Sequence, residues 1–125
     1  MPARTPEDLD RLFAQALNAG DLDALVALYE PHASLTPTPG RTVTGTAAIR
    51  EALAGFVGMR PTMKIEARVV SHADDLALVT ASWSLAMHGP DGQPQAMTGR
   101  SVEIARRQRD GDWLFAIDEP FGVGA

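Results

Sequence analysis

The sequence predicts an α+β domain in which three N-terminal helices pack on a strongly curved antiparallel sheet and form a cone. Two observations favour this fold. Apolar residues recur at helical spacing three times in the first 58 residues, and from residue 61 to residue 119 they alternate with the period of two that is typical of strands. Helices that precede a meander are typical of an antiparallel sheet covered on one face. Because the chain has 125 residues, we expect one domain over residues 1–125.

Capping residues delimit the expected helices. Thr5 is a good N-cap for the first helix, and Gly20 follows the residues that end it. Asp21 caps a second helix, which we expect to run as far as Pro31 because proline cannot continue a helix. A third helix begins at Thr46. Each of the three carries an apolar face at helical spacing.

The remaining segments are expected to be strands. Residues 32–39 contain Pro37 and Pro39, and we expect a brief edge strand or extended arm there because proline is confined to edge strands. Residues 63–70, 76–87, 98–108 and 113–119 follow as longer strands. The turn signals between them include Gly89-Pro90-Asp91-Gly92 and Asp110-Gly111, which predict hairpins.

Composition excludes several classes of function. The net charge is −5, and a field of that sign repels nucleic acid and anionic membranes, so we expect neither as a partner. The chain has no cysteine, which excludes disulfides, thiolate nucleophiles and cysteine-ligated zinc. Its three histidines lack close metal-ligand spacing, so we expect no metal, and we expect no cofactor. The N-terminus lacks the apolar core of a signal peptide, which predicts a cytoplasmic location.

Two stretches carry a resemblance to a known family. Residues 16–29, followed at the matching distance by residues 44–51, resemble bacterial ketosteroid isomerases and, more broadly, the SnoaL-like and nuclear transport factor 2-like superfamily. Residues 107–122 resemble the ends of uncharacterised SnoaL-like proteins. The resemblance implies the cone-shaped, cystatin-like fold, with an apolar pocket for a small hydrophobic molecule. It implies much less about activity, because this superfold hosts many functions.

The resemblance argues against steroid isomerase activity by the usual mechanism. That reaction needs a carboxylate base, a tyrosine and a protonated aspartic acid. The tyrosine position falls on Phe13 and the base position on Pro37, and neither side chain can do that work. The third position falls near Glu103, which keeps a carboxyl group. Two of the three roles are therefore lost.

Three residues are candidates for proton transfer. If Ser101, Glu103 and Ala105 face the inside of the cone, the carboxyl of Glu103 enters an apolar pocket and its pKa rises. Glu119 ends the last strand and is a second carboxylate that could approach Glu103 across the mouth. His32 follows the second helix and can act as a base near neutral pH. The alternative for each is an ordinary solvated or ion-paired side chain.

Core and pocket positions follow from the same periodicity. The residues expected to line the ligand pocket are Phe13, Leu17, Tyr29, Leu53, Phe56, Trp83, Leu85 and Ile117. Arg100 and Asp118 fall on the opposite face of their strands, where with the hydroxyls of Thr80, Ser82 and Ser84 they would make a polar outer face. Members of the resembled family commonly dimerise through that face, which implies a homodimer.

Three functions therefore remain open. The first is a SnoaL-like protein, as the resemblance implies, that binds a small hydrophobic molecule without turnover. The second is an enzyme of the isomerase, cyclase or hydrolase type that uses Glu103 with His32 or Glu119 for proton transfer, and the third is a non-catalytic dimerisation module. A buried carboxyl with a raised pKa favours the enzyme. An open apolar cavity without one favours the binding protein. A cavity filled by Phe13, Phe56 and Trp83 favours the dimerisation module.

Overall fold

Capping at both ends defines the long first helix. In the computed structural model, which describes residues 2–122, α1 spans Pro6–Ala19. The hydroxyl of Thr5 accepts a hydrogen bond from the Asp8 amide at 3.3 Å, and the Asp8 carboxylate accepts one from the Thr5 amide at 3.2 Å. Gly20 closes the helix with φ of 69°, a left-handed conformation that suits glycine. The predicted start and end of this helix are confirmed.

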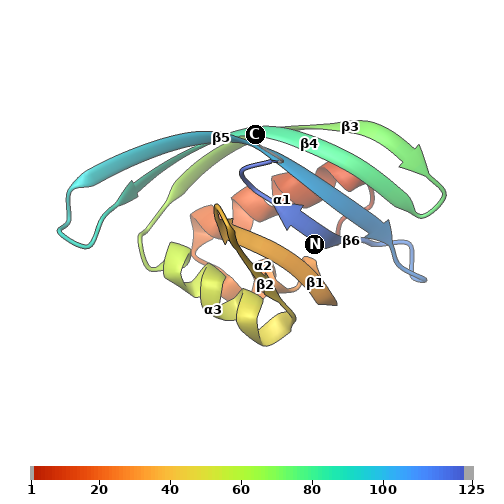
Figure 1. Cartoon of the computed structure of the whole chain (residues 1–125), viewed down its shortest axis with the longest axis horizontal. Coiled ribbons are helices and arrows are strands. Elements are labelled where there is room, and N and C mark those ends of the chain that lie inside the picture. The colour runs from red at the N-terminus through yellow and green to blue at the C-terminus, as the bar shows by residue number, and fades with distance from the viewer. Residues whose placement is uncertain (1, 123–125) are drawn as a thin grey trace.

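The second helix is shorter than predicted, and the third matches its prediction. α2 spans only Leu22–Val26, with the Asp21 side chain as its cap, and α3 spans Thr46–Val57. Tyr29 does not extend α2, because it is the first residue of a strand. α2 packs against α1 and α3, and α3 packs against β1 and β2 of the sheet (Figure 1).

Six strands form one open sheet in the described residues. They are β1 (Tyr29–Thr38), β2 (Arg41–Thr44), β3 (Thr62–Ala73), β4 (Leu76–His88), β5 (Pro94–Arg107) and β6 (Trp113–Glu119). Their order across the sheet is β2-β1-β6-β5-β4-β3. β3 to β6 form the predicted antiparallel meander. The α+β prediction is confirmed, but the sheet is mixed, because β1 runs parallel to β6.

The prediction that the first strand lies at an edge is wrong. β1 is an inner strand, paired with β6 on one side and with β2 on the other. Its paired positions with β6 are Tyr29, Ser34 and Leu35, and the register shifts between the first two. Pro31 and Pro37 lie outside these paired positions, which is how an inner strand accommodates residues that cannot donate to a ladder.

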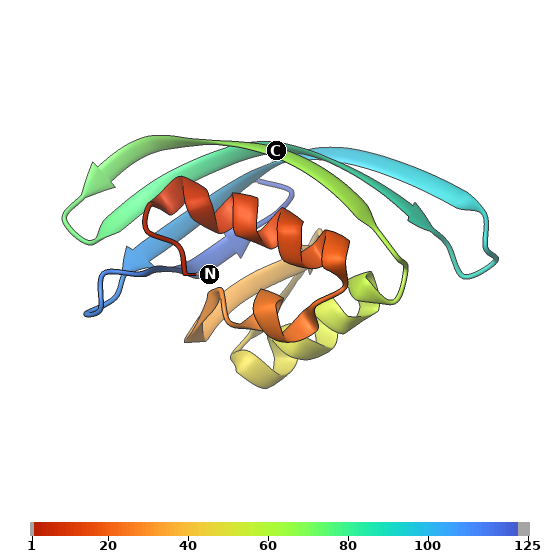
Figure 2. The same cartoon turned by 180° about the vertical axis from the view of Figure 1, so that it is seen from behind.

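The helices cover one face of the sheet, and the sheet arches over them (Figures 1 and 2). α1 crosses under β3, while α3 lies below β1 and β2. The core between these layers is apolar, and its most deeply buried side chains, at 2 % exposure or less, include Leu9, Leu25, Ile49, Leu53 and Phe115. Burial of this kind contributes about 1.5–3 kcal/mol for each large side chain.

A β-bulge in β6 changes which residues face the core. Ile117 pairs with Ile104 of β5, and Phe115 pairs with Ala105, so Ala116 is an extra residue. Trp113 and Phe115 point into the core as their alternation requires. Beyond the bulge the alternation inverts, so that Ile117 is 41 % exposed and Asp118 is 6 % exposed. The predicted inward placement of Ile117 and outward placement of Asp118 are both wrong for this reason.

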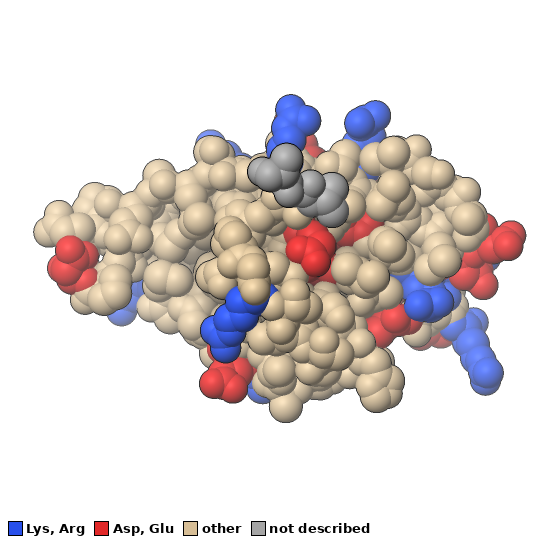
Figure 3. Space-filling view, viewed as in Figure 1, with Lys and Arg blue, Asp and Glu red and all other residues tan. Residues whose placement is uncertain are grey.

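Charged side chains of both signs are scattered over the face of the molecule seen in Figure 3, with apolar and neutral surface between them. The ion pairs of the described residues are exposed at one or both ends, as in Arg50–Asp23 at 2.8 Å and Arg107–Asp75 at 2.6 Å. Surface pairs of this kind contribute little to stability. Among residues 2–122, no helix is both long enough and apolar enough to cross a membrane.

Candidate functional site

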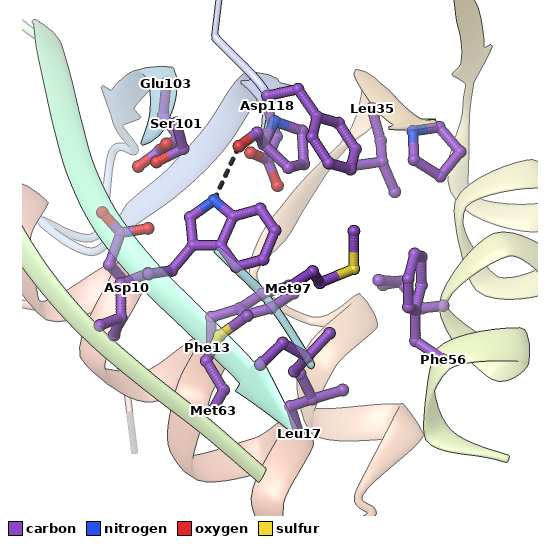
Figure 4. Close-up of a pocket in the computed structure, with 17 residues that line it drawn as sticks. Asp10, Phe13, Leu17, Leu35, Phe56, Met63, Met97, Ser101, Glu103 and Asp118 are labelled. Carbon is purple, nitrogen blue, oxygen red and sulfur yellow. Dashed lines mark hydrogen bonds between the residues drawn. The ribbon is translucent and has the colours of Figure 1, made fainter. Parts of the chain in front are cut away.

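A narrow cavity lies between the concave face of the sheet and the helices (Figure 4). The volume inside it that the centre of a water molecule can occupy is about 70 Å³. Its lining is mostly apolar and comes from α1, α3, β1, β3, β4, β5, β6 and the residues that follow β6. The lining residues are Asp10, Phe13, Leu17, Leu35, Pro37, Leu53, Phe56, Met63, Ile65, Trp83, Leu85, Met97, Ser101, Glu103, Asp118, Pro120 and Phe121.

The polar part of the cavity is an acidic floor, formed by Asp10, Ser101, Glu103 and Asp118. Asp10 projects from α1 toward the side chains of Ser101 and Glu103 on β5 (Figure 4). Asp10 is 4 % exposed, Glu103 is 1 % exposed, and both lie inside the apolar lining. With both carboxyls ionised, neither oxygen of Glu103 has a hydrogen-bond donor, and Asp10 Oδ2 also lacks one. A buried acceptor without a donor costs about 1–3 kcal/mol.

A proton shared between Asp10 and Glu103 would give these buried acceptors a donor and so lower this free-energy cost. Burial, followed by the hydrogen bond and the negative charge of Asp10, raises the pKa of Glu103 from 4.5 to about 11. Burial also raises the pKa of Asp10, while the hydrogen bond from Glu103 opposes that rise. Because two carboxylates side by side in a dry site cannot both ionise, Glu103 is the acid of the pair at neutral pH.

Asp118 makes a second, separate acidic group. The Tyr29 hydroxyl donates a hydrogen bond of 2.5 Å to Asp118 Oδ2. Burial raises the pKa of Asp118 from 3.8 to about 7, the hydrogen bond from Tyr29 opposes the rise, and the charges of Asp10 and Glu119 add to it. Burial and the same carboxyl raise the pKa of Tyr29, which therefore stays a donor. Asp118 thus changes its charge close to physiological pH.

Trp83 forms one wall of the cavity and is held in place from two sides. Its indole Nε1–H donates a 2.7 Å hydrogen bond to the carbonyl of Pro120, drawn as the dashed line in Figure 4. Its ring also packs edge-on against Phe121, with 5.7 Å between the ring centroids. On its other side the indole lies over Gly99, its cross-strand neighbour. The contacts with Trp83 therefore hold Pro120 and Phe121, which follow β6, against the cavity.

The structure brings most of the predicted pocket residues together. Six of them lie around the cavity, namely Phe13, Leu17, Leu53, Phe56, Trp83 and Leu85. Tyr29 lies outside the lining and beneath Asp118, whose carboxyl it positions. Ile117 does not line the cavity, because the bulge in β6 turns it outward.

The three predicted proton-transfer residues are separated. Glu103 lies in the acidic floor. His32 is exposed on β1 and does not line the cavity. Glu119 is half-buried outside the cavity, where its Oε1 accepts a 2.9 Å hydrogen bond from the Thr36 hydroxyl. The carboxyls that accompany Glu103 are instead Asp10 and Asp118.

Sequence reasoning missed these two aspartates for different reasons. Asp10, Phe13 and Leu17 stand at i, i+3 and i+7 on one stripe of α1, so helical spacing could have identified Asp10 as a cavity residue. Asp118 carried no such signal, because only the bulge turns it inward. In residues 2–122, no three or more histidine, aspartate or glutamate side chains are arranged to hold a metal ion.

Solved structures of low sequence identity share this fold. A ketosteroid isomerase-like protein from Erwinia carotovora atroseptica matches with a TM-score of 0.78 and 21 % identity over 90 % of this chain and 88 % of that one. A nuclear transport factor 2-like superfamily protein from Salmonella enterica matches at 0.78 and 18 %, over 95 % and 91 %. A Novosphingobium aromaticivorans protein proposed to be a scytalone dehydratase matches at 0.80 and 18 %, over 90 % and 78 %.

Sequence comparison assigns the family. A comparison with curated protein sequences finds no match. The model of the SnoaL-like domain family matches residues 9–115, which include most of α1, the strands β1 to β5 and the start of β6. Three of the four residues of the acidic floor, Asp10, Ser101 and Glu103, lie within the match. Because this match covers most of the chain and agrees with the fold, the chain belongs to the SnoaL-like domain family.

Proposed function

We propose that this chain is an enzyme of the isomerase, cyclase or hydrolase type that binds a small, mostly apolar molecule in the cavity and transfers protons through its acidic floor. The observation that carries this proposal is the burial of three carboxyls, those of Asp10, Glu103 and Asp118, in an otherwise apolar cavity. Burying carboxyls without a cation costs stability, and such a cost is typical of catalytic sites.

The two kinds of acid suit complementary roles. Glu103 holds its proton at neutral pH, so it can donate a hydrogen bond or a proton to an oxygen on which negative charge develops. Asp118, with a pKa near 7, is suited to accept a proton from a carbon or from water and to return it. The negative charge of Asp10 keeps Glu103 protonated, and because a carboxyl has one O–H, Glu103 releases its hydrogen bond to Asp10 when it donates to the substrate.

This mechanism differs from that of the steroid isomerases. Phe13 and Pro37 line the cavity where that reaction would need a hydroxyl and a carboxylate base, and neither can supply them. We therefore propose acid–base chemistry with Asp118 in place of the missing base. His32 and Glu119, the partners considered from sequence, have no part in this proposal, because neither lines the cavity.

Glu103→Gln tests the role of Glu103. A panel of small ketones, epoxides and hydroxylated ring compounds is incubated with the protein in D₂O, and turnover or deuterium incorporation is followed by NMR. For a compound that reacts, we expect the variant to lower kcat by about 10²–10⁴-fold, which is the range for loss of a general acid. KM should change much less, because the amide keeps the shape of the side chain.

Glu51→Gln is the matched control, since it makes the same carboxyl-to-amide change at an exposed position on α3. It should leave kcat and KM unchanged. Turnover by Glu103→Gln at the wild-type rate would refute the proposed role of Glu103. Saturable binding without turnover of any compound would favour the second candidate, a binding protein, which the mostly apolar lining supports.

A third candidate, a non-catalytic dimerisation module, rests on the outer face of the sheet rather than on the cavity. Leu78 and Ile117 are exposed there at 38 % and 41 %. The expectations of a homodimer and of a cytoplasmic location both stay predictions. The presence of a cavity supports the first two candidates more than this one.

A further inference from the structure

The acidic floor lacks a positive charge from the protein. In the described part of the chain, the cavity lining contains no lysine, arginine or histidine. The groups that lower or raise the pKa values of Asp10, Glu103 and Asp118 are other acids, hydroxyls and burial. Buried charges are ordinarily paired. Negative charge on this floor therefore has to be balanced by protons or by something that enters the cavity.

The floor also has fewer hydrogen-bond donors than acceptors. Four oxygen atoms there are buried and without a partner, namely Asp10 Oδ2, Ser101 Oγ and both carboxyl oxygens of Glu103. The hydroxyl of Ser101 and the proton shared by the carboxyls can satisfy part of this need. The remaining acceptors face the cavity, which is where a bound molecule would place its own donors (Figure 4). A ligand that only accepts hydrogen bonds would leave them unsatisfied.

We infer that the cavity binds a small primary ammonium ion with an apolar body, the ammonium group resting among Asp10, Ser101 and Glu103 on the acidic floor. This inference rests on the proposed function, because it takes the same cavity as the substrate site and adds the class of substrate. An ammonium group supplies three donors and the missing positive charge. The body would lie between the aromatic rings of the walls, whose faces also attract a cation.

The rest of the molecule suits such a ligand. Met63 and Met97 lie toward the end of the cavity away from the carboxyls, next to Leu17 and Phe56 (Figure 4). Methionine adapts its shape, so these residues can fit apolar bodies of different outline. The net charge of −5 also raises the local concentration of small cations around the molecule.

The inference predicts a distinctive pH dependence. The titratable groups of the floor are Asp10 from α1, Glu103 from β5 and Asp118 from β6. Two groups outside the cavity act on Asp118, namely Tyr29, which donates a hydrogen bond to it, and Glu119, whose charge raises its pKa. Asp118 loses its proton as the pH rises through about 7, so the floor gains negative charge between about pH 6 and pH 8. An ammonium ion should therefore bind more tightly at the higher pH. A neutral carbonyl compound, which needs the protonated acids as donors, should bind more weakly there.

Three probes of the same size separate these possibilities. Benzylamine, benzyl alcohol and benzaldehyde are titrated into the wild-type protein at about pH 6 and pH 8, with calorimetry for affinity and with the Trp83 indole N–H signal in NMR as a reporter in the cavity wall. We expect benzylamine to bind at least about tenfold more tightly than benzyl alcohol at pH 8, the ratio of one charge-assisted hydrogen bond. Its affinity should fall severalfold at pH 6.

Carboxyl-to-amide variants locate the ammonium group. Asp10→Asn and Glu103→Gln should each weaken benzylamine binding by about tenfold at pH 8 while leaving benzyl alcohol binding within about twofold. Glu51→Gln should change neither. Two results would overturn the inference: equal affinity of the wild-type protein for benzylamine and benzyl alcohol, or an affinity for benzylamine that neither variant changes. The wild-type pH series stands even if a variant misfolds.

The outcomes also separate this inference from the proposed function. Turnover of a carbonyl or epoxide compound, together with no preference for the amine, would leave the proposed enzyme intact and refute the ammonium site. Tight, pH-dependent amine binding with no turnover of any compound would support the ammonium site and count against the enzyme. Failure of all three probes to perturb Trp83 would refute the ammonium site, without bearing on turnover of larger compounds.

Discussion

Position 99 requires glycine because the indole of Trp83 lies directly over it and leaves no room for a side chain. A Cβ atom added at this position would come within 2.4 Å of Trp83 Cζ2 and 2.7 Å of Trp83 Cε2, far inside van der Waals contact. The indole cannot yield easily, since its Nε1–H is bound to the Pro120 carbonyl at 2.7 Å. The absence of a side chain on β5 thus sets the position of a cavity wall on β4.

We expect Gly99→Ala to lower the free energy of unfolding by about 1–3 kcal/mol, the usual cost of an overpacked site, and to shift the NMR signal of the Trp83 indole. Urea unfolding measures the first effect. Gly55→Ala is the matched control, because its Cβ would meet nothing within 4 Å and the position is helical, so it should be neutral or stabilising by up to about 1 kcal/mol. Equal stability of the two variants would contradict this account of Gly99.

At the scale of elements, periodicity predicted most of the fold. The capping signals around Thr5 and Gly20, the turn at Asp110-Gly111 and the alternation in β3 to β6 correctly placed helices and strands. These features depend on neighbours in sequence. The inner position of β1 depends instead on its parallel pairing with β6, about 85 residues away, and no local pattern encodes that pairing.

The candidate site was less predictable than the fold. Glu103 follows from the alternation of β5, which continues without a break through Ser101 and Ala105. Asp118 does not, because one extra residue, Ala116, inverts the alternation of β6 before it. Bulges occur next to active sites because they re-aim side chains in this way. The group whose pKa lies nearest to 7 therefore comes from a place where simple alternation fails.

At the scale of the whole molecule, the outer face of the sheet carries an apolar row. Leu78, Ile104 and Ile117 are neighbours across β4, β5 and β6 on the more exposed face of the sheet. Polar residues were expected on this face together with Asp118, but Asp118 faces the cavity and apolar side chains occupy part of the surface. An uncovered apolar row of this kind is typical of an interface.

We expect the chain to be a homodimer that buries this row. Sedimentation velocity at micromolar concentration should give the mass of a dimer, and Ile117→Lys should shift it to the monomer, since it places like charges against each other across a two-fold interface. Ala86→Lys, exposed on β4 about eight residues beyond Leu78, is the control and should remain dimeric. A wild-type protein that sediments as a monomer would contradict the expectation.

The acidic floor should also set how the stability of the whole molecule depends on pH. The pKa values of Glu103 and Asp118 are raised in the folded state to about 11 and about 7, from 4.5 and 3.8. Between the unfolded and folded values, the folded protein binds more protons than the unfolded chain, so stability is greatest below the lower value and falls as the pH rises. This is the reverse of the usual behaviour of ion-paired carboxylates.

We therefore expect the free energy of unfolding, measured in urea, to fall by at least about 1 kcal/mol between pH 5 and pH 8. Glu103→Gln removes the group with the largest shift, so it should flatten this slope and raise stability at pH 8, whereas Glu51→Gln should leave the slope unchanged. A wild-type stability that rises from pH 5 to pH 8 would mean that the carboxyls are solvated. In that case their burial would not lower the stability of the fold in the way that is typical of a catalytic site, and they would not need a cationic ligand to balance their charge.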